Sequence, residues 1–334
     1  MYPPGPHNLI TDIDGLSVGN AQDVVARTGL TVVLPDNPAT AAVDVRGGAP
    51  GTSETDALNP TCLVEHVDAI VLSGGSAFGL EAAAGVMAWL NARGRGFAIG
   101  GTRVPIVPCA ILFDLLNDGD KEWRTPPYRD LANAACNETA KTFELGNTGA
   151  GFGATAAALK GGLGSASSVS PGGVQVGAVV AANPFGSVVV PGTNSFWAWP
   201  LEQNGEFGGV RPDHSSMEPD FEFPMDSPIG ANTTIAVVAT NASLTVAQLE
   251  RVAIMAHDGI ARAVRPAHTP FDGDTVFALA TGTGSPEGPA QLGEIGMMAA
   301  DCLARAISRG VYEAGTLGNS PSYQSRHGSA AAES

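Results

Sequence analysis

The sequence is short of lysine, aromatic residues and charge, and these shortages exclude several classes of protein. Of 334 residues, three are lysines, 6% are aromatic and 15% are charged. The 17 basic residues are outnumbered by 33 acidic ones, and the resulting net charge of −16 repels nucleic-acid phosphates and anionic membrane surfaces. We therefore expect neither a nucleic acid nor a membrane among the partners of this protein.

Long apolar runs and paired cysteines are missing as well. No segment reaches the roughly 18 uninterrupted apolar residues of a membrane span, and the N-terminus lacks the basic and apolar regions of a signal peptide. The four cysteines lie far apart in apolar stretches without a CxxC pair, which indicates reduced core residues and argues against a zinc site. These features predict a cytoplasmic protein.

The abundant residues indicate a compact mixed α/β domain. The chain is 44% hydrophobic and contains 43 glycines and 24 prolines, which suits a buried core with many turns. Residues 233–240 form a β-branched run, and an amphipathic helix follows a capping box of Thr245 and Gln248. The acidic, Pro- and Gly-rich stretch 199–230 is expected to be an exposed connection, and 316–334 has the composition of a disordered tail.

The common catalytic and nucleotide-binding motifs are incomplete. Residues 74–78 fail the last position of the G-x-S-x-G nucleophile elbow, which disfavours a conventional serine hydrolase. Residues 149–154 match a loose dinucleotide fingerprint but lack a preceding strand and a later acidic residue, so close packing explains their glycines better. The histidines are scattered singly, and their spacing indicates no His-based triad or metal cluster.

Thr233 occupies an unusual place, at the junction between the 199–230 stretch and a buried strand. If the Asn232–Thr233 peptide bond were cut, Thr233 would gain an α-amine whose ordinary pKa suits a general base at neutral pH. Nucleophile and base would then belong to one residue, as in threonine-type amidases. The local pattern alone favours a simpler interpretation, in which a β-branched residue begins a strand.

Six motifs follow one another between residue 10 and about residue 280. They are ITDIDGLSVG (10–19), VDVRGGAPG (43–51), SGGSAFGL (73–80), GNTGAG (146–151), ANTTIAVVATN (231–241) and DGDTVF (272–277). This series resembles the P1, or S58, family of self-cleaving aminopeptidases and amidases, which includes L-aminopeptidase/D-esterase and β-aminopeptidases. Around residues 231–241 and 272–277, the chain is most similar to the threonine-type nylon-oligomer (6-aminohexanoate-oligomer) endo-hydrolases of the family.

The resemblance implies an α/β (α+β) fold in which residues 1–334 form a single domain. That fold is a four-layer αββα sandwich similar to the N-terminal nucleophile hydrolases. It also implies autoproteolytic maturation into a long chain, residues 1–232, and a short chain, residues 233–334. Members of the family assemble as tetramers or larger rings, so a homo-oligomer of processed heterodimers is expected.

The resemblance also implies four catalytic residues and a cleavage site. Cleavage between Asn232 and Thr233 would make Thr233 the nucleophile, with Asn183 as a donor that helps to hold the oxyanion. Asp272 and Asp274 would orient and charge-balance the threonine amine, because a nearby carboxylate favours the ammonium form. Without the resemblance, Asn183 is an Asx turn before a proline, and the Asp-Gly-Asp segment is a simple turn.

Two positions depart from the family pattern. Many relatives have a lysine where this chain has Ala158, and Lys160 lies two positions further on. We expect Lys160 to be a solvated surface residue, with a catalytic role as the alternative, because a shift of two positions changes the direction of a side chain. Phe78 replaces a tyrosine of the nylon-oligomer hydrolases, so nylon-oligomer activity is not assumed.

The implied activity is hydrolysis of a small peptide or amide through an acyl-enzyme on Thr233, without a metal or an organic cofactor. Amino-acid amides, β-peptides and 6-aminohexanoate oligomers are the candidate substrates. Two alternatives stay open: an acyltransferase of the ornithine acetyltransferase type, and a non-catalytic small-molecule-binding homologue, which Ala158 and Phe78 support. The retained Asn232–Thr233 pair, together with Asn183 and the two aspartates, argues against the binding protein.

Overall fold

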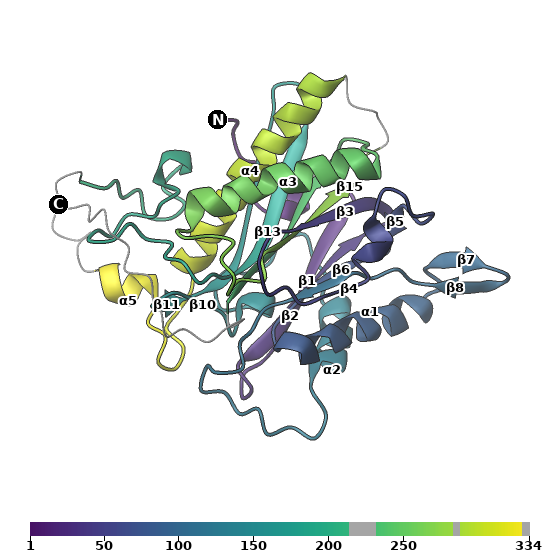
Figure 1. Ribbon diagram of the computed structural model, residues 1–334, viewed down its shortest axis with the longest axis horizontal. Coiled ribbons are helices and arrows are strands. Elements are labelled where there is room, and N and C mark those ends of the chain that lie inside the picture. Colours follow the sequence, from purple (N-terminus) through teal and green to yellow (C-terminus); the bar gives the residue numbers. More distant parts are fainter. Residues whose placement is uncertain (214–231, 283–287, 329–334) are drawn as a thin grey trace.

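Two β-sheets lie face to face between two pairs of helices in the computed structural model of the chain, which describes residues 1–213, 232–282 and 288–328 (Figure 1). One sheet has five strands, in the order β1 (Leu16–Asp23), β2 (Thr28–Pro35), β6 (Ile70–Ser73), β9 (Cys109–Ile111) and β4 (Thr52–Ser53). The other has six, in the order β12 (Gly162–Val169), β13 (Gln175–Asn183), β14 (Thr233–Thr240), β15 (Thr275–Ala280), β3 (Ala39–Val45) and β5 (His66–Val67). Two separate hairpins pair β7 (Phe97–Ile99) with β8 (Thr102–Val104) and β10 (Thr155–Ala156) with β11 (Leu159–Lys160).

The helices cover the outer faces of the two sheets. The helices α1 (Glu81–Asn91) and α2 (Tyr128–Asn137) pack on the five-stranded sheet, and α3 (Val246–Ala263) and α4 (Pro289–Tyr312) pack on the six-stranded one (Figure 1). Buried apolar side chains fill three layers, one beneath each helix pair and one between the sheets. The expected four-layer αββα sandwich is therefore confirmed.

The helix α3 begins where the sequence predicts. Thr245 Oγ1 accepts the backbone N–H of Gln248 at 3.3 Å, and Gln248 Oε1 accepts the backbone N–H of Thr245 at 2.9 Å. This capping box satisfies donors that the first turn of a helix leaves unpaired. Leu249, Val252 and Ile260 recur at helical spacing and are buried against the sheet, so the apolar stripe fixes which face of α3 packs inward.

Strand β14 determines where its first residue points. Ile235 and Val237 lie in the layer between the sheets, whereas Ala236 and Val238 lie in the layer beneath α3 and α4. Side chains of a strand alternate between its two faces. Thr233, two residues before Ile235, therefore starts β14 on the face that looks toward the other sheet.

The described part of the stretch 199–230, which ends at residue 213, is partly exposed and makes contacts with the core. Phe207 is buried, and its ring lies edge-on to that of Phe196 at 5.5 Å. The Glu206 carboxylate pairs with the buried Arg305 of α4, at 2.5 Å from Nε and 2.9 Å from Nη2. These contacts stabilise an ordered segment that composition alone did not predict. The remainder of the stretch lies outside the described residues.

The expected disordered tail, 316–334, is ordered up to residue 328. Residues Tyr323–His327 form a short helix, α5, that begins at the capping hydroxyl of Ser322. The Tyr323 ring lies 4.6 Å from that of Phe196, and its hydroxyl donates to the carbonyl oxygen of Asn194. One buried aromatic side chain thus anchors a polar segment, and the last six residues lie outside the described part.

Three cysteines occupy the core, as expected, and one does not. Cys109, Cys136 and Cys302 are buried, whereas Cys62 is exposed on the surface. The prediction of a core position from its apolar neighbours is wrong for Cys62, and the adjacent Leu63 is exposed as well. Among the described helices, none is both long enough and apolar enough to cross a bilayer.

Candidate active site

Thr233 and Asn183 lie side by side on neighbouring strands. Thr233, the first residue of β14, pairs in antiparallel register with Asn183, the last residue of β13. Both side chains are buried, with 2% and 0% of their surface exposed. Ala181 lies in the layer between the sheets, so strand alternation places Asn183 on the same inner face as Thr233. The structure thus brings these two predicted residues together.

The carbonyl group of Asn232 receives two donors. The Thr233 hydroxyl donates to the Asn232 carbonyl oxygen, and the backbone N–H of Gly273 donates to the same oxygen at 3.1 Å. Asn232 also forms a parallel bridge with Asp272. A hydroxyl therefore lies against the carbonyl that precedes it, and a backbone N–H is aimed at the carbonyl oxygen. Such a donor stabilises the negative charge that develops when a nucleophile adds to a carbonyl carbon.

Because Gly273 has no side chain, the Thr233 hydroxyl fits beside its backbone. A Cβ atom on Gly273 would lie 2.7 Å from the Thr233 hydroxyl oxygen and 2.8 Å from the carbonyl oxygen of Ala49. Any other residue would have to displace either the hydroxyl or the backbone. The sequence reading assigned no role to this glycine, although it stands between the two predicted aspartates.

Asp272 ties two loops together beneath the site. Its Oδ1 accepts the backbone N–H of Phe185 at 3.0 Å, and its Oδ2 accepts the backbone N–H and the hydroxyl of Thr269 at 2.9 and 2.5 Å. Burial, and after it the charge of Asp274, raises the pKa of Asp272, while these hydrogen bonds lower it. Phe185 follows Asn183 closely in the chain, so Asp272 helps to fix the end of β13.

Asp274 holds the start of β14. Its Oδ1 accepts the backbone N–H of Thr234 at 2.8 Å, and its Oδ2 accepts the backbone N–H of His268 at 3.1 Å. Within the described residues, neither carboxylate accepts a hydrogen bond from the Thr233 hydroxyl. The structure therefore places all four predicted catalytic residues at one end of the inner layer, with Asp272 bonded to the segment after β13 and Asp274 to the start of β14.

The Asn183 side chain is held from both of its polar ends. Its Oδ1 accepts the backbone N–H of Thr155 at 2.8 Å and the Thr155 hydroxyl at 3.3 Å, and its Nδ2 donates to the carbonyl oxygen of Phe113 at 3.2 Å. Phe113 is the second residue after β9, a strand of the opposite sheet. Asn183 thus joins the two sheets at the level of Thr233, with its orientation fixed.

Lys160 is buried, so the expectation of a solvated surface lysine is wrong. It is 1% exposed, and its Nζ donates to two backbone carbonyl oxygens at 2.9 and 2.8 Å. Burial lowers the pKa of Lys160 to about 7, and the charge of Asp114 acts in the opposite direction. In the β10–β11 hairpin Lys160 pairs with Thr155, whose N–H is bonded to Asn183. The backbone of Lys160 therefore lies beside a residue that is bonded to Asn183.

Ala158 lies in the turn of the same hairpin and is exposed. Its carbonyl oxygen accepts a hydrogen bond from Arg326 Nη1 at 3.2 Å. A lysine at this position would point away from the core, so its replacement by alanine removes nothing from the interior. The departure noted at position 158 is therefore no argument against catalysis, because the buried lysine of this hairpin is Lys160.

Asp114 belongs to the same region and was not among the residues predicted from the sequence. Its Oδ1 accepts the backbone N–H of Gly75 at 2.7 Å, and its Oδ2 accepts the Thr28 hydroxyl at 2.6 Å. Burial raises the pKa of Asp114 to about 6, and the two hydrogen bonds and the charges of two lysines lower it. An acidic residue directly after the apolar run of β9 was the available signal.

Two histidines form a pair that their spacing did not predict. The rings of His257 and His268 lie edge-on with centroids 4.9 Å apart, and His268 Nδ1 lies 2.7 Å from Asp274 Oδ2. The turn after α3 folds back on the helix, which brings residues eleven positions apart into contact. Across 1–213, 232–282 and 288–328, no three His, Cys, Asp or Glu side chains are grouped so as to hold a metal ion.

The aromatic residue of the 73–80 motif lies on the surface near Asp114. Phe78 is 51% exposed, and its ring is edge-on to Trp123 at 6.2 Å. Trp123 is in turn edge-on to the buried Tyr128, at 6.1 Å. The Tyr128 hydroxyl lies 3.1 Å from Thr28 Oγ1, the residue that binds Asp114. A row of aromatic rings therefore runs from the surface toward the buried acid.

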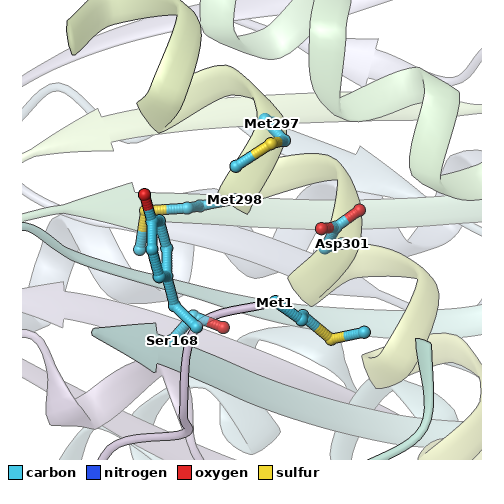
Figure 2. Close-up of a pocket in the computed structure, with 6 residues that line it drawn as sticks. Met1, Ser168, Met297, Met298 and Asp301 are labelled. Atoms are coloured by element: carbon cyan, nitrogen blue, oxygen red, sulfur yellow. The ribbon is translucent and has the colours of Figure 1, made fainter. Parts of the chain in front are cut away.

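A separate hollow of about 190 Å³ lies between the N-terminal segment and α4 (Figure 2). Its lining residues are Met1, Tyr2, Ser168, Met297, Met298 and Asp301. The Asp301 carboxylate accepts a hydrogen bond from Arg262 Nη1 at 2.7 Å. None of the predicted catalytic residues lines this hollow, so it is distinct from the site around Thr233.

Comparison with known proteins identifies the family of the chain. The sequence model of peptidase family S58 matches residues 8–322. A protein named uncharacterized aminopeptidase from Mycobacterium bovis is 45% identical over 341 aligned positions, which cover 95% of this chain and 97% of the relative. The 6-aminohexanoate-oligomer endohydrolase of Kocuria sp. is 31% identical, with 83% of this chain and 76% of the relative covered.

The fold also matches a solved structure. It is that of the L-aminopeptidase D-Ala-esterase/amidase from Ochrobactrum anthropi, described as a variant of the Ntn hydrolase fold, with a TM-score of 0.72. The match covers 95% of this chain and 90% of the other at 23% identity, so it concerns the fold alone. Together these findings place the chain in peptidase family S58, as a hydrolase of peptide or amide bonds with a variant of the N-terminal nucleophile hydrolase fold.

Proposed function

We propose that the protein cuts its own chain between Asn232 and Thr233 and then hydrolyses small amides with Thr233 as the nucleophile. The observation that carries this proposal is the contact between the Thr233 hydroxyl and the Asn232 carbonyl, with the Gly273 N–H donating to the same carbonyl oxygen at 3.1 Å. Nucleophile, electrophile and oxyanion donor are thus present at one peptide bond.

The cutting step is an N-to-O acyl shift followed by hydrolysis. Thr233 Oγ1 adds to the carbonyl carbon of Asn232, the C–N bond breaks, and the hydroxyl proton passes to the Thr233 nitrogen. The resulting ester is hydrolysed by water, which leaves a carboxylate on Asn232 and a free amine on Thr233. The products are the chains 1–232 and 233–334.

The same residue then serves in catalysis. The free amine of Thr233 accepts the proton of its own hydroxyl as that hydroxyl attacks the substrate carbonyl, and an acyl-enzyme forms as the amine product leaves. The Asn183 side chain, buried beside Thr233, supports the proposal that its N–H stabilises the oxyanion. Water then attacks the ester and releases the acyl group.

The remaining polar residues set the geometry and the charge of the site. Asp272 and Asp274 hold the loops and the strand that carry Thr233, through the hydrogen bonds described above. Burial lowers the pKa of Lys160 to about 7, so near neutral pH its amine is divided between charged and neutral forms. We assign Lys160 an electrostatic role beside Asn183, in balance with the ionised Asp114.

The substrates proposed are small peptides and linear amides. Relatives named aminopeptidase and 6-aminohexanoate-oligomer endohydrolase support amino-acid amides and 6-aminohexanoate oligomers, and β-peptides complete the set. The processed protein is proposed to act without a metal or organic cofactor, as a homo-oligomer of tetrameric or larger size. The exposed thiol of Cys62 supports action in a reducing compartment such as the cytoplasm.

An amide panel tests this function. Purified protein and Thr233→Ala are incubated with aminoacyl p-nitroanilides, amino-acid amides, β-dipeptides and 6-aminohexanoate dimers and trimers. We expect release of amine from at least one class by the wild-type protein and none by the variant. Hydrolysis that survives in Thr233→Ala would contradict the assigned nucleophile. Exclusive transfer of the acyl group to an added amine would identify an acyltransferase instead.

A further inference from the structure

One carboxylate, that of Asp274, joins His268 to strand β14. Its Oδ1 accepts the backbone N–H of Thr234 at 2.8 Å, one residue after the nucleophile of the proposed function. Its Oδ2 lies 2.7 Å from His268 Nδ1 and accepts the His268 backbone N–H at 3.1 Å. The Asp274 side chain is 2% exposed and that of His268 is 24% exposed, so the imidazole is the member of this chain that reaches solvent.

His257 limits the rotation of the His268 ring. His257 is buried on α3, and its Nε2 lies 2.9 Å from the carbonyl oxygen of Asp44. A carbonyl oxygen only accepts, so Nε2 of His257 carries the hydrogen. Burial lowers the pKa of His257, which keeps the ring neutral at neutral pH. This neutral ring packs edge-on against His268 at 4.9 Å and limits its rotation.

The other ionisable side chains around His268 either have partners of their own or are neutral. Asp44 lies on β3, and its Oδ2 is bound by Arg46 Nε at 2.5 Å. Asp272 and Asp274 lie on the same turn as His268, and α3 contributes the neutral His257. Among the described residues, His268 is the ionisable side chain that forms a hydrogen bond with the aspartate pair, through Asp274. The donors to Asp272 are Phe185 and Thr269.

We propose that His268 is a positioning residue for the amidase reaction, which fixes Asp274 and, through it, the start of strand β14 that presents Thr233. Because a carboxylate only accepts, Nδ1 of His268 carries a hydrogen and donates it to Asp274 Oδ2. The carboxylate is then locked with Oδ1 on the Thr234 N–H.

Two substitutions test the hydrogen bond from His268 to Asp274. His268→Asn retains an N–H near the place of Nδ1, whereas His268→Ala does not. With the best amide substrate at pH 8, we expect kcat to fall about tenfold in His268→Ala and to be largely restored in His268→Asn, with KM little changed. The exposed His66, substituted by Asn, is the matched control and should behave as wild type.

A second readout is independent of turnover. In the uncut Thr233→Ala background, hydrogen exchange at the amides of residues 234 and 235 should accelerate with His268→Ala and return toward the parent rate with His268→Asn. Equal exchange and equal kcat in His268→Ala and His66→Asn would overturn the role of His268 while leaving the proposed function intact. An inactive, uncut wild type would overturn the proposed function, and the exchange measurement would still decide whether His268 positions β14.

Discussion

The backbone N–H of Gly273 donates to the carbonyl oxygen of Asn232 at 3.1 Å, from a turn 41 residues further along the chain. The contact depends on glycine, because a Cβ at position 273 would lie 2.7 Å from the Thr233 hydroxyl oxygen. The Asp-Gly-Asp turn therefore does more than carry two carboxylates. It supplies a donor to the peptide bond that we propose is cut, and it leaves space for the hydroxyl that cuts it.

Gly273→Ala should impair self-cleavage. The added methyl group must displace either the Thr233 hydroxyl or the backbone donor, and loss of one oxyanion donor costs on the order of a hundredfold in rate. The measurement is a time course of chain cleavage on a denaturing gel. Gly293→Ala is the control, since a Cβ there meets open space in α4. Cleavage of Gly273→Ala at the wild-type rate would show that the Gly273 geometry plays no part.

Asn183→Ala should lower kcat more than it raises KM. Its N–H is proposed to act on the oxyanion of the transition state, and removal of such a donor costs about 10² to 10³ in kcat. Steady-state kinetics of the mature protein measures both constants. Asn133→Ala, on the exposed side of α2, is the matched control. A rise in KM at unchanged kcat would instead assign Asn183 to ground-state binding.

Because Lys160 is buried, we expect the free energy of unfolding to depend on pH. Burial lowers the pKa of Lys160 from its ordinary value of 10.5 to about 7 in the folded protein. At a pH between these two pKa values, the amine is protonated in the unfolded chain and neutral in the folded one. The cost of burying Lys160 is therefore full at pH 6 and falls as pH rises. Relative to Lys160→Met, the wild-type side chain should gain about 1.4 kcal/mol of stability per pH unit above pH 7.

Urea unfolding of both proteins at pH 6, 7, 8 and 9 checks this. Both carry Thr233→Ala, so that one continuous chain unfolds. The difference in free energy of unfolding between them isolates Lys160, because the other titrating groups are common to both. A difference that stays constant from pH 6 to pH 9 would contradict a depressed amine pKa.

Arg305 should hold the two proposed chains together after cleavage. It is fully buried on α4 of the short chain, and it binds Glu206 of the long chain at 2.5 and 2.9 Å. Arg305→Met leaves a buried carboxylate without its main partner and should cost about 3 to 5 kcal/mol. Arg262→Met removes an arginine that is 44% exposed and should cost less than about 1 kcal/mol. Equal thermal shifts in the two variants would contradict the difference in burial.

The sequence predicted those features that depend on local pattern. The capping box of Thr245 and Gln248 marks the start of α3, and β-branched residues mark β14, because these signals come from neighbours in the chain. The resemblance to a family supplied the sandwich and the residues around Thr233. Their proximity then follows from the register that pairs Asn183 with Thr233.

Features that depend on distant contacts escaped prediction. Burial of Lys160 follows from its two backbone acceptors and from the packing of the β10–β11 hairpin, which no spacing rule encodes. The pairing of His257 with His268 requires the turn after α3 to fold back. The tail was expected to be disordered from its polar composition, yet the buried ring of Tyr323 orders it.

The mass of the purified chains tests the central claim most directly. Intact-mass analysis and N-terminal sequencing of the wild-type protein should find two chains that correspond to residues 1–232 and 233–334, with Thr233 as the first residue of the shorter one. Thr233→Ala, purified in the same way, should give one chain of 334 residues. A single uncut wild-type chain, or a cut at another bond, would contradict Thr233 as the self-generated nucleophile.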